Sequence, residues 1–180
     1  MRARFCERCG TRLHERPPTR CPGCGAEQWI DEKACANVLV LDDEARVLLV
    51  RRAHAPWLGT WCAPGGFCNE LEHPVAAAER ELLEETGLRG RVTAFLGIWV
   101  CRYADDQGDE DADALSVAYY LGRPLGGKPE PRDGEASEVA WFALEALPAE
   151  LTPPFEPVVE AARAAIAAGR TETPLPDVPR

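Results

Sequence analysis

Short apolar runs separated by polar turns dominate the middle of the chain and predict β-strands. Residues 34–41 and 46–51 flank a polar turn, so these two runs are expected to form a hairpin. Longer strands are expected over 92–103 and 115–122, joined by an acidic loop, and a shorter strand over 138–142. This part of the chain is therefore expected to build a sheet.

Two segments have the hydrophobic spacing of helices. The first begins at Pro74, because proline suits a first helical turn, and ends at Gly87, because glycine readily adopts the left-handed conformation of a helix C-terminus. Between them, apolar residues recur at roughly helical spacing. The second helix, over 157–168, is rich in alanine. Strands around a central helix, with another helix at the end, predict an α/β fold: an α/β/α sandwich with a mixed sheet.

Composition and charge fit a small soluble protein. The chain has 180 residues, with 20 Lys and Arg against 30 Asp and Glu, a net charge of −10 and a pI near 4.8. This balance argues against broad nucleic-acid binding, which needs a basic surface, although a bound metal can still attract nucleotides. No apolar run has the length of a signal peptide core or a membrane span, so a cytoplasmic protein without a membrane partner is expected.

The N-terminal cysteines predict a metal site. They form two Cys-x-x-Cys knuckles, 11 residues apart and each followed by glycine: Cys6, Cys9, Cys21 and Cys24. Four thiolates in a segment with little core suit a structural zinc ion with no open coordination position. Two disulfides or a redox motif are the alternatives; a cytoplasmic setting disfavours the first, and the pairing of the knuckles disfavours the second. The remaining cysteines are scattered and are expected in the core or in loops: Cys35, Cys62, Cys68 and Cys101.

Three glutamates before Gly87 suggest a second metal site. Glu81, Glu84 and Glu85 share one side of the predicted helix and repel one another at neutral pH. A magnesium ion would resolve this repulsion, since oxygen ligands suit it and it also binds substrate phosphates. The alternative is a solvated acidic helix, which does not account for the glycines and the glutamate that precede the helix.

Arg80 directly precedes the carboxylates. It is expected to point away from them and to pair with Glu72 in the preceding loop. Such a pair would fix the loop against the helix.

Gly66, Glu72 and the run from Arg80 to Leu88 together resemble the Nudix box at every defined position. The resemblance covers about residues 34–147 and implies the Nudix sandwich fold. It also implies a catalytic magnesium or manganese ion held by Glu81, Glu84, Glu85 and the Gly65 carbonyl. In this interpretation the structural positions of the box are Gly66, Glu72 and Arg80.

The resemblance implies hydrolysis of the pyrophosphate bond in a nucleoside diphosphate linked to another moiety, releasing AMP. A zinc ribbon ahead of the domain resembles NADH pyrophosphatases, but their Ser-Gln-Pro-Trp stretch after the box is missing. Residues 96–103 look more like ADP-ribose pyrophosphatases, so ADP-ribose is expected ahead of NADH and FAD. Related enzymes are often homodimers. The alternative is a non-catalytic nucleotide sensor whose ribbon, locally basic, contacts a protein or nucleic-acid partner.

Further residues are candidates for contact with substrate. Arg51 and Arg52 end a predicted strand and suit phosphate binding. Glu84 or Glu85 can orient the attacking water, or a base can come from outside the box, as Glu135 or Glu138. Four aromatic residues are candidates to stack on a base, although most aromatics of such a domain lie in the core: Trp61, Phe67, Trp99 and Tyr103.

The expected domains are a zinc ribbon over 1–31, the catalytic domain over 32–150, and a helix with a flexible tail over 151–180. Residues 105–113 carry a run of carboxylates. They form either a lid that supplies metal ligands or, as the composition favours, a solvated loop.

Overall fold

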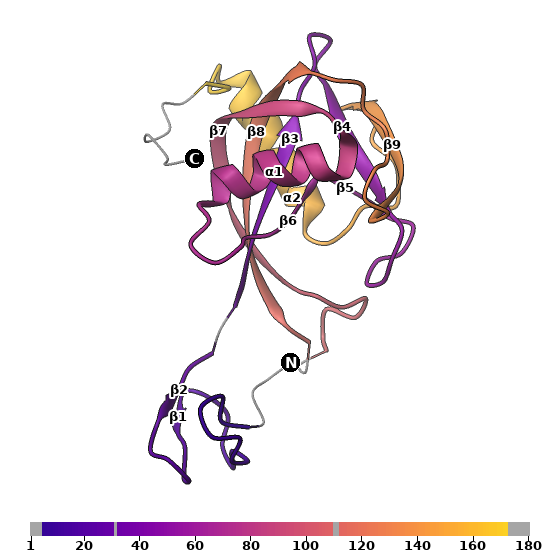
Figure 1. Cartoon of the computed structure of the whole chain (residues 1–180). Helices are drawn as coiled ribbons and strands as arrows, with labels where there is room; N and C mark the ends of the chain where they lie inside the picture. The colour runs from indigo at the N-terminus through magenta and orange to yellow at the C-terminus, as the bar shows by residue number, and fades with distance from the viewer. Residues whose placement is uncertain (1–4, 31, 110–111, 173–180) are drawn as a thin grey trace.

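The computed structural model describes residues 5–30, 32–109 and 112–172 (Figure 1). In chain order the elements are β1 (Thr19–Arg20), β2 (Glu27–Gln28), β3 (Lys33–Val40), β4 (Arg46–Arg52), β5 (Trp61–Cys62), β6 (Gly65–Phe67), α1 (Pro74–Thr86), β7 (Arg89–Arg102), β8 (Ala114–Gly126), β9 (Ala136–Ala143) and α2 (Phe155–Ala167). Among these residues, no helix is long and apolar enough to cross a membrane.

Two sheets form the larger part of the molecule. One has the strand order β6-β3-β8-β7 and the other the order β5-β4-β9. Strand β3 pairs in parallel with β8, with Leu39 opposite Leu121, and antiparallel with β6. The expectation of a mixed sheet is therefore confirmed.

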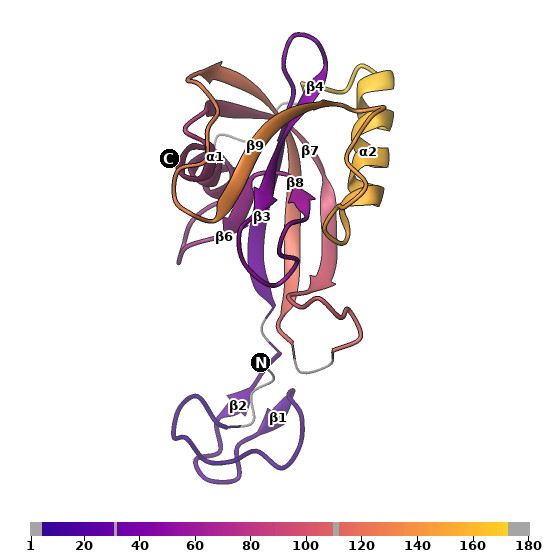
Figure 2. The ribbon, with the colours of Figure 1, turned by 90° about the vertical axis from the view of Figure 1, so that its right-hand side faces the viewer.

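The two helices lie on opposite sides of the sheets (Figure 2). Successive side chains of a strand point to opposite faces. Leu39 belongs to the core cluster that includes Phe155 of α2, whereas Val38 and Val40 belong to the cluster that includes Leu82 of α1. All five are at most 1% exposed. This arrangement confirms the α/β/α sandwich.

The predicted hairpin of residues 34–41 and 46–51 is wrong. Strands β3 and β4 belong to different sheets, and only one bridge, between Leu41 and Val47, connects them in the described part of the chain. The polar turn between them is present, since the Asp42 carboxylate accepts hydrogen bonds from the backbone N–H of Glu44 and of Arg46. The turn reverses the chain, but β3 takes β8 as its long partner instead of the next strand.

The ribbon lies at the N-terminal end of β3, away from the sandwich (Figure 1). Its β1 and β2 pair antiparallel, with Thr19 opposite Gln28. The C-terminal helix begins two residues earlier than expected, at Phe155. Parts of three expected segments lie outside the described residues: 1–4 of the ribbon, 110–111 of the acidic loop and 173–180 of the tail. The domain boundaries stay a prediction.

Candidate active site

Capping at both ends fixes where α1 starts and stops. His73 is the N-cap, and its Nδ1 accepts a hydrogen bond from the Val75 N–H at 3.2 Å, with Pro74 in the first turn. At the other end Gly87 adopts φ 68° and donates its N–H to the Leu83 carbonyl at 2.8 Å. A residue with a side chain would be strained in this conformation. The caps set the register that brings the box glutamates to the sheet edge formed by β6.

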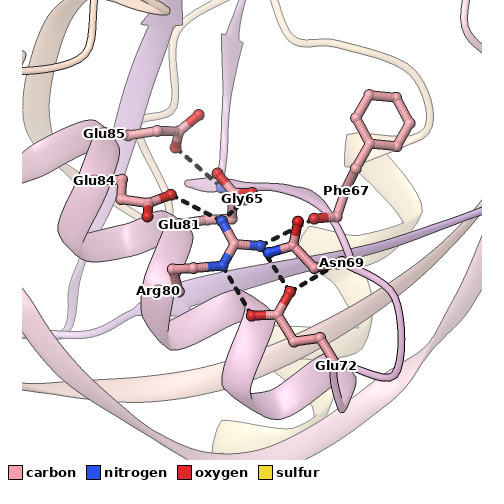
Figure 3. A network of polar contacts seen from close by, with 8 residues as sticks. All are labelled: Gly65, Phe67, Asn69, Glu72, Arg80, Glu81, Glu84 and Glu85. Carbon is pink, nitrogen blue, oxygen red and sulfur yellow. Dashed lines mark hydrogen bonds and ion pairs between the residues drawn. The ribbon is translucent and has the colours of Figure 1, made fainter.

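Glu85 is the most deeply buried carboxylate of this helix. It is 6% exposed, and its Oε2 accepts one hydrogen bond from the Gly65 N–H at 3.0 Å (Figure 3). Burial raises the pKa of Glu85 well above its ordinary value, against the opposing effect of the Gly65 hydrogen bond. No basic side chain among the described residues pairs with it. A buried carboxylate without a cation is costly, so this position calls for a proton or a metal ion.

Glu81 lies against the glycines that precede the helix. A Cβ on Gly66 would come within 2.7 Å of the Glu81 carboxyl carbon, so residue 66 has to be glycine while this carboxylate keeps its position. Burial raises the pKa of Glu81, and the neighbouring Arg80 works in the opposite direction. The glycine of the motif is thus a packing requirement.

Arg80 is the centre of the polar network in Figure 3. Its Nε and Nη2 donate to both carboxylate oxygens of Glu72 at 2.8 Å, and Nη2 also donates to the Phe67 carbonyl at 3.0 Å. Its Nη1 donates to Glu81 at 2.7 Å and to Glu84 at 2.8 Å. The expected pair with Glu72 is present, but the expectation that Arg80 points away from the cluster is wrong. One guanidinium carries five N–H donors and serves both sides at once.

Glu72 is held from two directions. Besides Arg80, it accepts a hydrogen bond from the Asn69 N–H at 2.8 Å. The hydrogen bonds from Arg80, with that of Asn69, lower the pKa of Glu72 to about 2. The loop before α1 is therefore tied to the helix by a charged pair that stays ionised over the whole physiological range.

The oxygen donors of this site suit a hard divalent cation. Glu81, Glu84 and Glu85 offer carboxylates from one helix, and the backbone of Gly65 lies beside them. In this structure Arg80 neutralises two of the three carboxylates, and the third is the buried Glu85. The residues present thus fit magnesium or manganese in their chemistry.

A cavity of about 240 Å³ opens beside the box. Arg52 and Glu135 line it, whereas Arg51 and Glu138 do not and instead pair with each other at 2.7 Å. The structure therefore separates the four candidates into two that face the cavity and two that form an exposed ion pair. The rest of the lining comes from Cys35, Asn37, Trp57, Cys62, Gly65, Gly66, Phe67, Asn69, Arg80, Glu81, Cys101, Tyr103, Leu115, Val117, Tyr119, Thr152 and Pro153.

The aromatic candidates divide in the same way. Phe67 and Tyr103 line the cavity, with ring centroids 5.6 Å apart. Trp61 packs against another core aromatic at 4.9 Å, and Trp99 packs on the core at 5.6 Å from its neighbour's ring. Sequence reasoning missed Trp57, which also lines the cavity, because a single tryptophan in a loop carries no periodic or motif signal.

The paired cysteines come together in the ribbon. Their sulfur atoms all lie within 4.8 Å of one another: Cys6, Cys9, Cys21 and Cys24. Gly10 and Gly25 adopt φ 71° and 73°, and each donates its N–H to the carbonyl of the first cysteine of its knuckle. Hydrogen bonding to Thr11 lowers the pKa of Cys9 to about 6, which favours the thiolate. This donor set fits a tetrahedral zinc ion.

The scattered cysteines are no part of this cluster. Burial raises the pKa of Cys62 and of Cys35 to about 12 each, and it also raises the pKa of Cys101. All three line the cavity beside the box as neutral thiols.

The model of the NUDIX domain matches residues 32–162, well over half of the chain. The chain belongs to the Nudix family. The resemblance inferred from the box is thereby confirmed.

Individual Nudix relatives are more distant. The ADP-ribose pyrophosphatase of Methanocaldococcus jannaschii is 31% identical over 109 residues, which cover 61% of each of the two chains. The NAD-capped RNA hydrolase NudC of Pseudomonas aeruginosa is 27% identical over 149 residues, 81% of this chain and 49% of NudC. A Nudix hydrolase structure from Nitrosomonas europaea shares the fold, with a TM-score of 0.70 and 22% identity over 91% of this chain and 90% of its own. The chain thus spans 61% and 49% of the length of these two curated relatives.

Proposed function

We propose that this chain hydrolyses the diphosphate linkage of nucleoside diphosphate derivatives, with ADP-ribose as its principal substrate. Water adds to one phosphorus, the P–O–P bridge breaks, and the products are AMP and ribose 5-phosphate. The observation that carries the proposal is Glu85, a buried carboxylate without a basic partner among the described residues, which accepts a hydrogen bond from Gly65 in the lining of the cavity that also contains Arg52. The similarity to an ADP-ribose pyrophosphatase supports the choice of substrate.

In this proposal Glu81, Glu84, Glu85 and the Gly65 carbonyl hold magnesium or manganese. When bound, such an ion lowers the pKa of a coordinated water and neutralises charge that develops on the phosphates. Arg80 holds both Glu81, which lines the cavity, and Glu84 through hydrogen bonds. Glu72 holds Arg80 in place through two hydrogen bonds of 2.8 Å.

Two residues outside the box complete the proposed site. Arg52 donates N–H groups to the substrate phosphates, for which its planar fork is suited. Glu135 acts as the base that orients the attacking water, because it lines the cavity and its charge raises the pKa values of both Glu81 and Glu85. Glu138 is less suited to this role, since Arg51 already engages it.

The ribbon has a structural role in this proposal. Four cysteine thiolates occupy every position of a tetrahedral zinc ion, which leaves none for substrate: Cys6, Cys9, Cys21 and Cys24. The ribbon therefore contributes no group to hydrolysis.

NAD(H) is a second candidate substrate. The similarity to NudC extends over 81% of this chain, further than the similarity to the ADP-ribose pyrophosphatase, which covers 61%. NAD(H) contains the same diphosphate linkage, so the same residues would serve.

Product analysis by chromatography tests the proposal. Purified protein with magnesium is offered ADP-ribose, NADH, NAD, FAD, diadenosine polyphosphates and nucleoside triphosphates in parallel. We expect AMP and ribose 5-phosphate from ADP-ribose at the highest kcat/KM. Preference for NADH would favour the second candidate, and no turnover of any compound with magnesium or manganese would favour a nucleotide sensor.

A further inference from the structure

Arg52 is oriented without being neutralised. Its Nε donates to the Pro56 carbonyl at 2.8 Å, and its Nη2 donates to the Tyr103 hydroxyl at 3.4 Å. The guanidinium carbon lies 5.5 Å from the ring centroid of Trp57 and 6.0 Å from that of Tyr103, distances typical of cation–π contacts. Within the described residues, Arg52 forms no ion pair with a carboxylate. Its charge therefore stays available to an anion in the cavity.

Both aromatic residues contact the Arg52 guanidinium in addition to lining the cavity. Trp57 and Tyr103 meet edge to face, with centroids 5.6 Å apart, and the Arg52 guanidinium lies close to both. Phe67, which is 45% exposed, is the ring of this group left open for a base. Placement of Trp57, together with the hydrogen bonds to Pro56 and Tyr103, consequently contributes to where the Arg52 charge lies.

In the described part of the chain, the position of Trp57 is fixed by hydrogen bonds of its backbone and not by polar contacts of its side chain. It has φ 63°, a left-handed conformation that a tryptophan rarely adopts, and its carbonyl accepts hydrogen bonds from the Thr60 N–H at 3.1 Å and the Thr60 hydroxyl at 2.7 Å. Its indole N–H is buried and has no partner among the described residues, so the ring is not fixed by a polar contact of its own. Asp105 contacts Trp57 itself from outside this loop: its carboxylate accepts a hydrogen bond from the Trp57 backbone N–H.

We infer that Asp105 is a positioning residue for substrate binding. By accepting the Trp57 N–H, it holds Trp57 in its strained conformation, and Trp57 together with Tyr103 sets Arg52 toward the phosphates. Asp105, in the acidic segment after β7, therefore acts on the cavity through a hydrogen bond. This inference rests on the proposed function, because it assigns a phosphate group to Arg52.

The neighbouring Asp106 provides a matched control. It carries the same charge in the same segment, but its carboxylate accepts a hydrogen bond from Gly108 within that segment. Removing Asp106 changes the charge of the loop without touching Trp57. Asp105→Asn loses the charge but keeps an oxygen that can accept from the Trp57 N–H.

The test compares Asp105→Ala, Asp105→Asn and Asp106→Ala in the full chain with ADP-ribose and magnesium. We expect Asp105→Ala to raise KM about tenfold with little change in kcat, because binding shared by substrate and transition state is lost. We expect Asp105→Asn and Asp106→Ala to keep the wild-type KM. An unchanged KM in Asp105→Ala would overturn the inference, and so would a fall of kcat at constant KM in both Asp105 variants, which would make Asp105 a catalytic group.

A second measurement does not depend on turnover. The ¹⁵N-indole resonance of Trp57, assigned by its loss in Trp57→Phe, is expected to shift in Asp105→Ala and to stay in place in Asp106→Ala. If the resonance does not move in Asp105→Ala, the tie between the two segments does not exist. If the wild type hydrolyses none of the nucleotides while the resonance behaves as expected, the proposed function fails but the contact of Asp105 with Trp57 stands.

Discussion

Among the described residues, the ribbon buries only Cys6, Leu13 and Cys21 in its apolar cluster, with Ala26 packed against them, whereas the domain that follows has large apolar clusters on both faces of its sheets. A segment as short as the ribbon cannot offset the entropy of ordering its backbone with so little apolar burial. The domain can, because its strands alternate side chains into two layers. The domain is thus stabilised by apolar burial, whereas the ribbon needs another source of stability, and we propose that metal–sulfur bonds at its four-cysteine cluster supply it.

Removing one sulfur should have the largest effect. In Cys21→Ser we expect loss of zinc and of the ribbon fold, since binding of structural zinc contributes on the order of 10 kcal/mol. The domain should keep its thermal transition and its activity. Zinc content by atomic absorption, proteolysis of the ribbon and calorimetry together measure this. Cys68→Ser is the control and should retain the metal; equal loss of zinc in both variants would contradict the proposed ligand set.

A cavity-creating substitution in the apolar core tests the stability of the domain separately from that of the ribbon. Phe155 is 1% exposed and belongs to the cluster beneath α2. Phe155→Ala should lower the free energy of unfolding of the domain by about 3 to 5 kcal/mol while the ribbon keeps its zinc. Denaturant unfolding measures the first and metal content the second. Leu125→Ala, at a side chain that is 61% exposed, should change the stability little. Loss of zinc in Phe155→Ala would mean that the two regions depend on each other.

The Glu72–Arg80 ion pair should contribute less to the free energy of unfolding than a core side chain does, but more than an ion pair on the surface. We expect Glu72→Gln to lower the stability of the domain by about 2 kcal/mol at pH 7. Folding lowers the pKa of Glu72 to about 2 from the value of about 4.3 that a glutamate has in an unfolded chain. The wild type should therefore lose this advantage in stability as the pH falls from about 4.3 toward 2. Unfolding of both proteins between pH 7 and pH 3 measures the difference. A gap between them that stays constant with pH would contradict the assignment.

An exposed ion pair in the ribbon should have the smallest effect. Arg20 and Glu27 lie 3.1 Å apart, but their side chains are 71% and 57% exposed. Glu27→Gln should change zinc affinity and ribbon stability by about 0.5 kcal/mol or less, because water screens such pairs. Competition with a zinc chelator, compared with the wild type, measures this. A large loss of zinc in Glu27→Gln would contradict this expectation, because it would show that the surface ion pair contributes strongly to the stability of the ribbon.

Local patterns predicted the elements of the fold but not all of their pairing. The alternation in 34–41 and 46–51 identified two strands, and the turn at Asp42 is real, yet β3 and β4 lie in different sheets. Periodicity reports which face a residue occupies, and it does not identify the neighbouring strand. The long partner of β3 is β8, with Lys33 opposite Leu115 far along the chain.

The candidate site shows the same limit. Gly66, Glu72 and Arg80 could be found from sequence because their contacts lie within one loop and the helix that follows it. The additional bonds of Arg80, and the role of Trp57, depend on side-chain directions and on a positive φ that no sequence pattern reveals.

Glu85 occupies a costly buried position, and we propose that it is kept there because the reaction needs its charge. The most direct test measures kcat and thermal stability of Glu85→Gln with ADP-ribose and magnesium. We predict a fall in kcat of about 10³-fold or more, while the melting temperature stays equal to or above that of the wild type, because a buried charge has been removed without loss of volume. The carboxamide oxygen introduced by this substitution can still accept the Gly65 N–H. Wild-type turnover in this variant would contradict the proposed role of Glu85.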